Sequence, residues 1–483
     1  MSSNNMGCEP RRILVVYEQP HTVPCRETMR AHLRVFETSS TRHEVEYFNA
    51  HEALPPDWAW RRNPVSRLCE IPSQSFDVVL FHYSLLGMRT LGHDFYHWKQ
   101  NFSWLADLSG LKIAVPQDEG DYAAILDEWL EELGVSIIFS VHYGPEGPLY
   151  PIMRSKAAIY PCLPGYIDDV QAIRIRDSLV PIADRPIDIA YRARKLPLRY
   201  GRAGRMKSLL AEVIADHASQ RGFTTDVSTR AADTIAGSHW LDFLASARVV
   251  PGAEGGYSAI DWRGELRAQY NALLRAEPGL TFDKFSRRLP DGWDDSQLLT
   301  ITPRHFEAII TKSCQVLVEG DYKGVLKPHE HFIPLRHDFS NLAEVLETMR
   351  DHGYLQEIAD RAYEDICKSN RYTYRTWARQ LDEIIEQHDS AEHRKHQRMS
   401  QSNTDKAAIE ALERQLIAAR QENARIQAQF HEMAEEIADR TADQVLPRLV
   451  QGFRKSIVRL LPLAIAVLAL LFAALAMLIV WLR

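Results

Sequence analysis

Cysteine is scarce in this sequence, and the few cysteines stand far apart. The 483 residues include six of them, and no two form a C-x-x-C pair. A disulfide framework or a structural zinc site needs cysteines at short, regular spacing. The sequence therefore argues against both arrangements and indicates reduced thiols in a cytosolic protein.

The sequence also lacks an excess of positive charge. Its 57 basic and 64 acidic residues give a net charge of −7, which argues against a general nucleic-acid binder. The first ten residues are polar and have no apolar core of the kind found in signal peptides, so we expect them to be disordered and the body of the protein to be cytoplasmic. An apolar content of 45% and this length are typical of two or three globular domains.

Two common phosphate-binding motifs are missing as well. No G-x-G-x-x-G follows the first predicted strand at residues 13–17, and the sequence contains no Walker motif. These motifs position backbone N–H groups around the phosphates of dinucleotides and nucleoside triphosphates. Their absence argues against dinucleotide or P-loop chemistry.

Residues 11–165 alternate between apolar strands and helices. The predicted strands after the first are residues 43–49, 76–82, 111–116 and 136–141, and the predicted helices are residues 26–36 and 122–133. This alternation predicts a parallel sheet with helices on both faces, and such sheets bind ligands at the carboxyl ends of their strands. His82, Asp118 and His142 stand at such ends, and we select His82 and Asp118 as candidates. The alternative is that they are turn formers or helix caps.

A second α/β series occupies residues 180–388. Its first strand, residues 187–190, runs into a basic loop that contains Arg192, Arg194 and Lys195, and then through Gly204 into a helix. Free N–H groups at a helix start and cations in the loop before it both attract a diphosphate. We therefore expect a phosphate site here. The alternative is a solvated basic loop.

Residues 302–335 form the stretch around which the second series is organised. Thr302 and Pro303 predict a helix start, because a hydroxyl caps free N–H groups and proline suits the first turn. Glu307 is predicted to lie in the first turn, where a carboxylate interacts favourably with the helix dipole. A short apolar strand, residues 316–318, comes next. A carboxylate in this position is placed where open α/β sheets bind ligands.

The triplet Phe306-Glu307-Ala308 in this setting resembles the C-terminal domain of group-1, family 4-like GT-B glycosyltransferases. The resemblance covers residues 180–385 well and residues 11–165 only in outline. It implies two Rossmann-like domains, with an acceptor domain at 11–165 and a nucleotide-sugar domain at 180–388. It also implies that Glu307 hydrogen-bonds the donor ribose. The resemblance further implies that basic side chains neutralise the phosphates of the donor. The candidates for this role are Arg192, Lys195, Arg194 and Arg304, and Gly204 is a further candidate for donor binding.

Members of this family usually carry two glutamates eight positions apart, and that spacing is broken here. The glycine-bracketed Glu254 follows a strand, and backbone without side chains lets sugar hydroxyls approach. We interpret Glu254 as the first glutamate, separated from Glu307 by an insertion at about residues 259–299. The resemblance implies catalytic or acceptor-contacting roles for Glu254, His82 and Asp118. It also implies a hexosyltransferase that retains configuration.

We expect no metal and no cofactor other than the nucleotide-sugar substrate, because no Asp-x-Asp occurs in the sequence. That motif binds the metal in the other major transferase fold. Basic side chains and a helix start could stabilise the leaving diphosphate instead.

The C-terminal part of the chain has a different composition. A polar linker is predicted at residues 389–404 and a coiled coil at 405–446, which implies a homodimer; a single amphipathic helix is the alternative. Its apolar seam alternates steps of three and four residues, with Asn423 at an a position: Ile409, Leu412, Leu416, Ala419, Asn423, Ile426, Phe430, Met433 and Ile437.

A transmembrane helix is predicted at residues 457–482. Residues 460–482 carry no charge, and at about 1.5 Å per residue they are long enough to cross a hydrocarbon core of about 30 Å. Basic residues precede them, which places that side in the cytoplasm. We therefore expect a single-pass protein of the inner (plasma) membrane with cytoplasmic catalytic domains.

The leading interpretation is a glycosyltransferase that modifies a glycan or lipid-linked acceptor for surface polysaccharide synthesis. Two others remain open at this point. The same fold could carry a nucleotide-sugar epimerase or phosphorylase, or a degenerate transferase fold could serve as a non-catalytic coiled-coil scaffold at the membrane.

Overall fold

The computed structural model describes residues 10–20, 27–39, 43–54, 75–142, 144, 147–235, 237, 239–399 and 424–425. The chain divides into two compact units, Met1–Arg398 and Met399–Arg483. The predicted coiled coil, apart from residues 424 and 425, and the predicted transmembrane helix lie outside the described residues, as do residues 1–9. None of the described helices combines the length and the apolar character that crossing a membrane requires.

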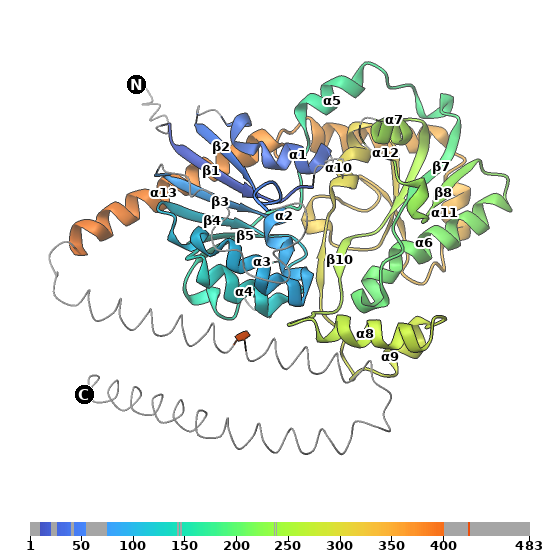
Figure 1. Cartoon of the computed structure of the whole chain (residues 1–483). Helices are drawn as coiled ribbons and strands as arrows, with labels where there is room; N and C mark the ends of the chain where they lie inside the picture. Colours follow the sequence, from blue (N-terminus) through green and yellow to red (C-terminus); the bar gives the residue numbers. More distant parts are fainter. Residues whose placement is uncertain are drawn as a thin grey trace, which may run out of the picture. The chain divides into compact units, whose positions relative to one another are not determined.

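The first unit contains two parallel β-sheets, as the α/β prediction required (Figure 1). The N-terminal lobe has the strand order β2-β1-β3-β4-β5-β6, with all neighbours parallel. These strands are β1 (Arg12–Tyr17), β2 (Glu44–Asn49), β3 (Val78–His82), β4 (Leu111–Val115), β5 (Ile137–Ser140) and β6 (Ala158–Pro161). Every residue of β3, β4 and β5 is buried, which is expected of central strands covered on both faces.

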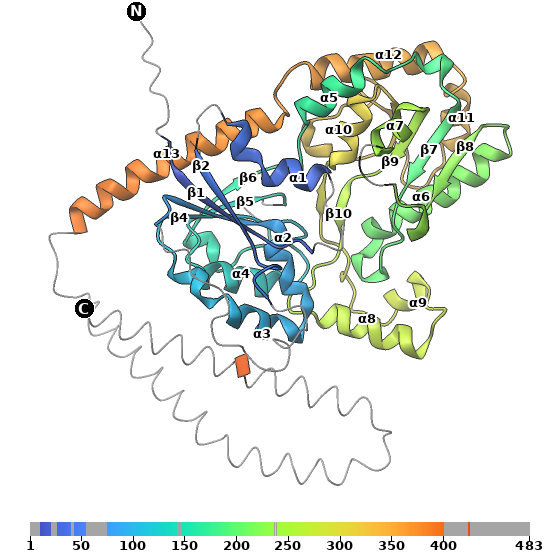
Figure 2. The same cartoon turned by 45° about the horizontal axis from the view of Figure 1, so that its top comes forward.

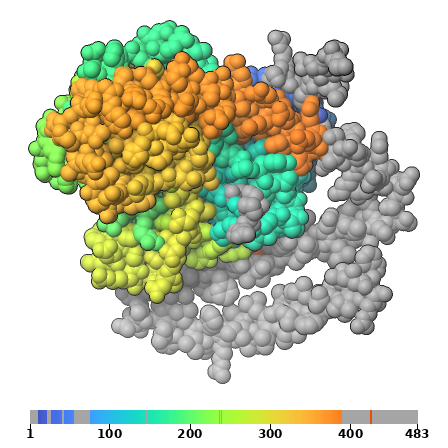
Figure 3. Space-filling model, turned by 180° about the vertical axis from the view of Figure 1, so that it is seen from behind, coloured from blue at the N-terminus to red at the C-terminus, as the bar shows by residue number. Residues whose placement is uncertain are grey.

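Alternate residues of the N-terminal strands face two different cores. Leu14, Val79 and Ala114 belong to the core under α3 and α4, whereas Ile13, Val78 and Ile113 belong to the core under α1 and α13. The helices of this lobe are α1 (Glu27–Leu33), α2 (Tyr83–Leu86), α3 (His93–Asn101) and α4 (Ala123–Glu132). Helix α13 (Tyr374–Met399) comes from the end of the unit and covers the N-terminal sheet (Figures 2 and 3).

Helix α13 is anchored to the N-terminal lobe by polar contacts as well. Asp382 accepts hydrogen bonds from the Ser39 hydroxyl and from His43 Nε2, the latter at 2.9 Å. The helix continues to Met399, so the first part of the segment predicted as a polar linker is helical. The segment contains several Glu, Lys, Arg and Gln residues, whose side chains suit a helix even without burial.

The C-terminal lobe has the strand order β13-β12-β9-β7-β8, again all parallel. Its strands are β7 (Ile187–Arg192), β8 (Thr225–Ser228), β9 (Ala247–Gly252), β12 (Cys314–Val318) and β13 (Ile333–Leu335). Its helices are α5 (Asp169–Arg176), α6 (Gly201–Ser219), α7 (His239–Ala245), α10 (Pro303–Ile310), α11 (Leu342–Thr348) and α12 (His352–Ala362). Val249 and Val316 face α6, α11 and α12, whereas Val250 and Leu317 face α5, α7 and α10.

The predicted insertion leaves and re-enters the C-terminal lobe at a two-stranded antiparallel ribbon. Strands β10 (Gly255–Tyr257) and β11 (Leu298–Thr300) pair so that Gly255 lies opposite Thr300. Residues 258–297, which we call the strap, run between them and contain α8 (Glu265–Ala276) and α9 (Phe282–Ser286). Because the ribbon closes the excursion, residue 254 lies beside the segment that leads into α10.

Candidate functional site

The two lobes meet at the carboxyl-terminal ends of their sheets. The segment after β4 reaches the C-terminal lobe, where the Gly120 N–H donates to the Tyr257 hydroxyl at 2.6 Å. The Arg199 guanidinium forms an ion pair with Asp121, and both side chains are only 6% exposed. Ligand sites of open parallel sheets lie at these strand ends. We therefore expect a ligand site at the boundary between the lobes.

A basic pair and a carboxylate come together at this boundary. Lys207 projects from the second turn of α6, and desolvation lowers the pKa of its ammonium group; Arg304 lowers that pKa further, whereas Asp118 in the other lobe raises it. Asp118 is accessible to solvent yet enclosed by protein on most sides, and this desolvation raises the pKa of its carboxyl group. Two of the sequence candidates, Asp118 and Arg304, thus lie around Lys207.

Lys207 itself was not among the sequence candidates. The sequence pattern indicated the basic loop before the helix, whereas Lys207 lies inside the helix, one turn after the buried Gly204. Residues three apart share a face of a helix. A basic residue on the face otherwise occupied by buried small residues was the signal that could have identified it.

Helix α10 begins as predicted, with Thr302 as N-cap and Pro303 in the first turn. The Thr302 N–H donates to His305 Nδ1 at 2.9 Å, so histidine takes the place that glutamate usually has in a capping box. Burial lowers the pKa of His305 to about 3, which keeps the ring neutral and its Nδ1 free to accept. This cap holds the start of α10, and with it Arg304, at the boundary between the lobes.

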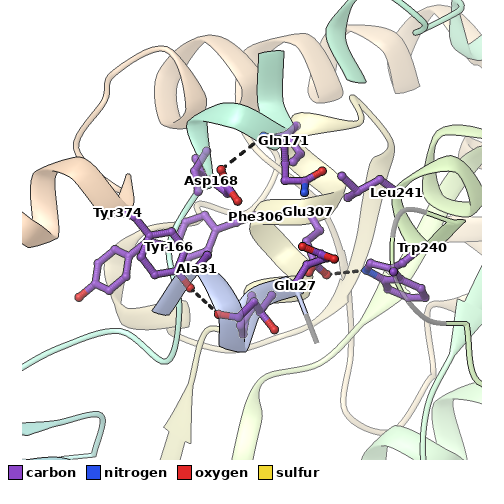
Figure 4. A pocket seen from close by; sticks show the side chains of 15 residues that line it. Glu27, Ala31, Tyr166, Asp168, Gln171, Trp240, Leu241, Phe306, Glu307 and Tyr374 are labelled. Atoms are coloured by element: carbon purple, nitrogen blue, oxygen red, sulfur yellow. Dashed lines mark hydrogen bonds between the residues drawn. The ribbon is translucent and has the colours of Figure 1, made fainter. Parts of the chain in front are cut away.

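Glu307 lies in the second turn of α10, not in the first turn as predicted, and faces a small cavity (Figure 4). Trp240 Nε1 donates to Glu307 Oε2 at 2.6 Å. The cavity has a volume of about 50 Å³ and is lined from both lobes, by Glu27 of α1 as well as by Trp240 and Glu307. Most of its other walls are apolar. A carboxylate in such a setting suits a neutral polar group, such as a sugar diol, rather than a phosphate.

Glu254 follows β9, and its carboxylate rests on the loop after β12. Its Oε1 accepts a hydrogen bond from the Tyr322 N–H at 2.9 Å, and desolvation raises the pKa of the carboxyl group. A Cβ atom on Gly320 would lie 2.4 Å from Glu254 Oε2, so glycine leaves room for the carboxylate here. The structure therefore places Glu254 at the carboxyl ends of β9 and β12, with one oxygen held by the backbone.

His142 lies across from this loop in the N-terminal lobe. It follows β5, and its ring centroid is 5.5 Å from that of Tyr257. Burial, and then the nearby Lys323, lower the pKa of His142 to about 3, so its imidazole is neutral. His142 was noted as a strand-end residue but not selected. Its position opposite the C-terminal lobe makes it a stronger candidate than His82.

His82 is completely buried at the end of β3. Within the described part of the chain, its Nδ1 accepts from the Ser84 N–H at 3.2 Å, which caps α2, and its ring packs edge-on against His32 at 4.9 Å. Burial holds the pKa of His82 well below its usual range. These contacts match the alternative role given for His82, that of a helix cap. They do not place His82 beside Asp118 or Glu254.

Arg192 is the last residue of β7 and not a loop residue. Its guanidinium donates to Asp226 Oδ1 at 2.7 Å, to the Asp226 carbonyl at 2.8 Å and to the Asp233 carbonyl at 3.1 Å. It also lies 4.5 Å from the centroid of the Phe243 ring. Arg192 therefore ties the end of β8 to the loop after it. The Arg192 carbonyl accepts a hydrogen bond from Arg304 Nη1 at 2.5 Å.

The prediction that the N–H groups at the start of α6 are free to bind a diphosphate is wrong. The Arg202 N–H donates to Asp294 Oδ2 at 2.8 Å, and the Ala203 N–H donates to the Ser258 hydroxyl at 3.2 Å. Both acceptors belong to the strap, which caps the helix. A Cβ on Gly204 would lie 2.5 Å from Tyr200 Cβ, so this glycine serves close packing.

Arg194 and Lys195 are exposed on the loop that follows β7. Their surroundings are those of the solvated basic loop that we gave as the alternative.

One group of side chains in the described residues has the spacing of metal ligands. Atoms of Glu330, His331 and Asp365 lie within 4.8 Å of one another. However, His331 Nδ1 accepts a hydrogen bond from the Lys327 N–H at 3.2 Å. In a neutral ring the proton is then on Nε2, which faces Asp365 at 3.2 Å. The His331 Nε2–H therefore donates to the Asp365 carboxylate. A metal ion bound at Nε2 would require that nitrogen to be deprotonated.

No protein-family model and no curated protein matches the sequence. Among solved structures, the chain is similar to an alpha-glucosyltransferase in complex with UDP-glucose and DNA containing an abasic site, with 10% identity and a TM-score of 0.40 over 78% of this chain and 99% of that one. It is similar to Anabaena Alr3699/HepE in complex with UDP and glucose, with 10% identity and a TM-score of 0.38 over 78% and 99%. It is also similar to AviGT4, a glycosyltransferase involved in avilamycin A biosynthesis, with 13% identity and a TM-score of 0.38 over 78% and 97%.

Proposed function

We propose that this chain is a GT-B glycosyltransferase that binds a nucleotide-diphosphate sugar between its two lobes. The observation that carries the proposal is the grouping of Lys207, Arg304 and Asp118 where the carboxyl ends of two parallel sheets meet. Lys207 of the C-terminal lobe interacts electrostatically with the Asp118 carboxylate of the N-terminal lobe, and Arg304 lies near Lys207. A diphosphate would interact favourably with the cations, and the carboxylate would remain for an acceptor hydroxyl.

Each of these residues has a separate role in the proposed reaction. As the bond to the sugar breaks, negative charge grows on the leaving diphosphate, and Lys207 and Arg304 are placed to stabilise it. Glu307 would hold the ribose of the donor. Glu254 and His142 stand at the strand ends where the sugar would lie, and Asp118 could accept the proton of the acceptor hydroxyl.

We also propose that transfer needs no metal and proceeds with retention of configuration. The cation pair gives a way to stabilise the leaving group without a metal, and the sequence contains no Asp-x-Asp motif. Retention is supported only by the likeness of residues 302–335 to the group-1 transferases.

The C-terminal segments support a proposal on location. Residues 457–482 would anchor the protein in the inner membrane, with the lobes in the cytoplasm, and residues 405–446 would pair two copies as a coiled coil. An anchored enzyme meets membrane-bound acceptors at a high effective concentration. The acceptor would then be a glycan or a lipid-linked saccharide. Truncation after Leu446 should move the protein from the membrane to the soluble fraction and leave transfer to a soluble acceptor intact.

Replacement of Lys207 tests the donor site directly. Nucleotide sugars are first screened by thermal shift of the full chain, because a true donor stabilises the folded state. Lys207→Met should then weaken binding of the best donor about tenfold or more, since one charge-assisted contact to the diphosphate is lost. Mass analysis of products with and without acceptor separates transfer from epimerisation.

The matched control is Lys327→Met, since the Lys327 side chain is 62% exposed on a loop of the same lobe. It should bind the donor like the wild type. If no nucleotide sugar stabilises the wild type, or if both lysine variants bind equally well, the proposed function is wrong.

A further inference from the structure

Glu307 is held by a tryptophan from a neighbouring helix. Trp240 is the second residue of α7, and its indole N–H reaches Glu307 Oε2 at 2.6 Å. A hydrogen bond to an ionised carboxylate is shorter and stronger than one between neutral groups. Leu241 and Leu244 of the same helix are buried, so α7 is fixed against the lobe. The bond therefore restricts the direction in which the carboxylate points.

The same indole ring also contacts the side chain of Arg304. The Arg304 guanidinium lies 5.5 Å from the ring centroid of Trp240, within the range of a cation–π contact. Trp240 packs against Phe243 with ring centroids 5.7 Å apart, and Phe243 carries the guanidinium of Arg192 on its face. One side chain thus links the cation proposed for the diphosphate to the carboxylate proposed for the ribose.

Trp240 and Glu307 line the same cavity at the lobe boundary (Figure 4). The cavity volume of about 50 Å³ has room for a few water-sized groups, which is the size of the hydroxyl edge of a pentose. A carboxylate that rotates freely binds a diol less selectively than one held in place, because its rotational freedom is lost on binding at a cost in free energy. Holding Glu307 would therefore raise selectivity for a ribose over a sugar that lacks the hydroxyls.

We propose that Trp240 is a positioning residue for the donor, which orients Glu307 toward the ribose hydroxyls and Arg304 toward the diphosphate. The inference rests on the proposed function. Trp240 makes these contacts through two different parts of its ring, the N–H to Glu307 and the π face to Arg304. A substitution that removes only the N–H should therefore affect ribose recognition and leave the stacking in place.

The test compares a nucleoside diphosphate with its 2′,3′-dideoxy counterpart. The best-binding nucleoside diphosphate of the full chain is chosen from a panel, and both affinities are measured by calorimetry. In the wild type, we expect the ribonucleotide to bind at least about tenfold more tightly, because the dideoxy compound lacks the two hydroxyls that Glu307 would bind. Trp240→Phe should reduce this preference several-fold, mainly by weakening binding of the ribonucleotide.

Two further variants keep the result interpretable. Trp240→benzothienylalanine exchanges the N–H for sulfur in a ring of the same shape. It should reduce the ribose preference as Trp240→Phe does, even if the smaller phenyl ring of Trp240→Phe destabilises the lobe. Trp262→Phe is the matched control, because Trp262 is 38% exposed on the strap. It should keep the full preference. A tryptophan that serves packing alone would change the melting temperature without changing the preference.

The outcomes separate the inference from the function on which it rests. If Glu307→Gln loses the ribose preference while both Trp240 variants keep it, Glu307 binds ribose without help and the inference is overturned. If no nucleoside diphosphate binds the wild type, the proposed function fails and the inference fails with it. Loss of the preference in Glu307→Gln and in both Trp240 variants, with Trp262→Phe unchanged, supports the inference.

Discussion

Lys207 is the residue whose charge decides whether the proposed donor site works. Desolvation and the nearby Arg304 both disfavour its protonated form, and the carboxylate of Asp118 in the other lobe favours it. The result is a pKa below the usual 10.5 of a lysine. A protonated Lys207 is needed to attract a diphosphate, so Asp118 supports donor binding even though its own charge repels phosphate at longer range.

The pH dependence of donor binding follows from this balance. Affinity should be highest below the lowered pKa of Lys207 and should fall as the pH rises through it. Asp118→Asn removes the group that raises this pKa, so the fall should move to lower pH. Calorimetry of nucleotide binding between about pH 7 and pH 10 measures the shift.

Lys207→Met is the control for this experiment, because it removes the titrating group and should show no such fall. An unchanged midpoint in Asp118→Asn would mean that the two residues do not interact across the cleft.

What the sequence can predict about single residues depends on where their partners lie. The start of α10 was predictable, because Thr302, Pro303 and His305 are neighbours in sequence and form the cap together. Arg192 was not, since its partner Asp226 lies 34 positions away. The start of α6 was harder still, because the residue that caps it, Asp294, is 92 positions away. In sequence, both Arg192 and the start of α6 resembled parts of a phosphate site. Only the fold shows that protein groups accept the hydrogen bonds of the Arg192 guanidinium and of the N–H groups at the start of α6.

At the level of elements, the strap connects the two lobes. In the C-terminal lobe it caps α6 through Ser258 and Asp294. In the N-terminal lobe it pairs with the segment before α4: the Asp261 N–H donates to the Gly120 carbonyl at 2.8 Å, and the Ala123 N–H donates to the Asp261 carbonyl at 3.0 Å. The strap therefore helps to fix the width of the cleft in which we place the substrate.

Removal of the cap on α6 should destabilise the C-terminal lobe. Asp294 is 6% exposed and accepts from the Arg202 N–H, so Asp294→Ala leaves a donor at the helix start unsatisfied. Loss of an N-terminal cap lowers the free energy of unfolding by about 1 kcal/mol. Urea denaturation measures this change.

The adjacent Asp295 offers a control. Its side chain is 69% exposed and forms only a surface ion pair with Arg202, so Asp295→Ala should change the stability much less. Equal destabilisation by the two variants would argue against the capping role.

The elements themselves were predictable to different degrees. Strands β3, β4 and β12 are buried along their whole length, and their largely apolar residues marked them in the sequence. Strand β6 was missed, because it is a half-exposed edge strand that ends in proline. The place of the insertion was inferred from a broken spacing of glutamates, but its contact with the N-terminal lobe could not be inferred, since backbone pairing across the lobes leaves no local signal.

At the scale of the whole first unit, the lobes are joined by a buried ion pair. Arg199 and Asp121 are each 6% exposed, and the Tyr200 hydroxyl also donates to Asp121 at 2.8 Å. Arg199 and Tyr200 together lower the pKa of Asp121 against the opposing effect of burial. The carboxylate is therefore kept ionised at the lobe boundary by groups from the C-terminal lobe.

Breaking this pair should loosen the boundary between the lobes. Arg199→Ala leaves Asp121 partly uncompensated, and removing one partner of a buried ion pair lowers the free energy of unfolding by about 3 kcal/mol. Urea denaturation followed by tryptophan fluorescence measures the loss.

Arg263→Ala is the comparison variant, because Arg263 also bridges the lobes, to Glu128, with both side chains about 40% exposed. It should cause little change. A large effect of Arg263→Ala, with none for Arg199→Ala, would contradict this account of the boundary.

The central claim is that a nucleotide sugar binds between the two lobes. Hydrogen–deuterium exchange of the full chain, with and without the nucleotide sugar that stabilises it most, tests this claim most directly. We predict slower exchange in three segments at the cleft: residues 118–120, residues 252–256 and the start of α10 at residues 302–307. Slower exchange confined to the outer helices α11 and α12, with the three cleft segments unchanged, would contradict the claim.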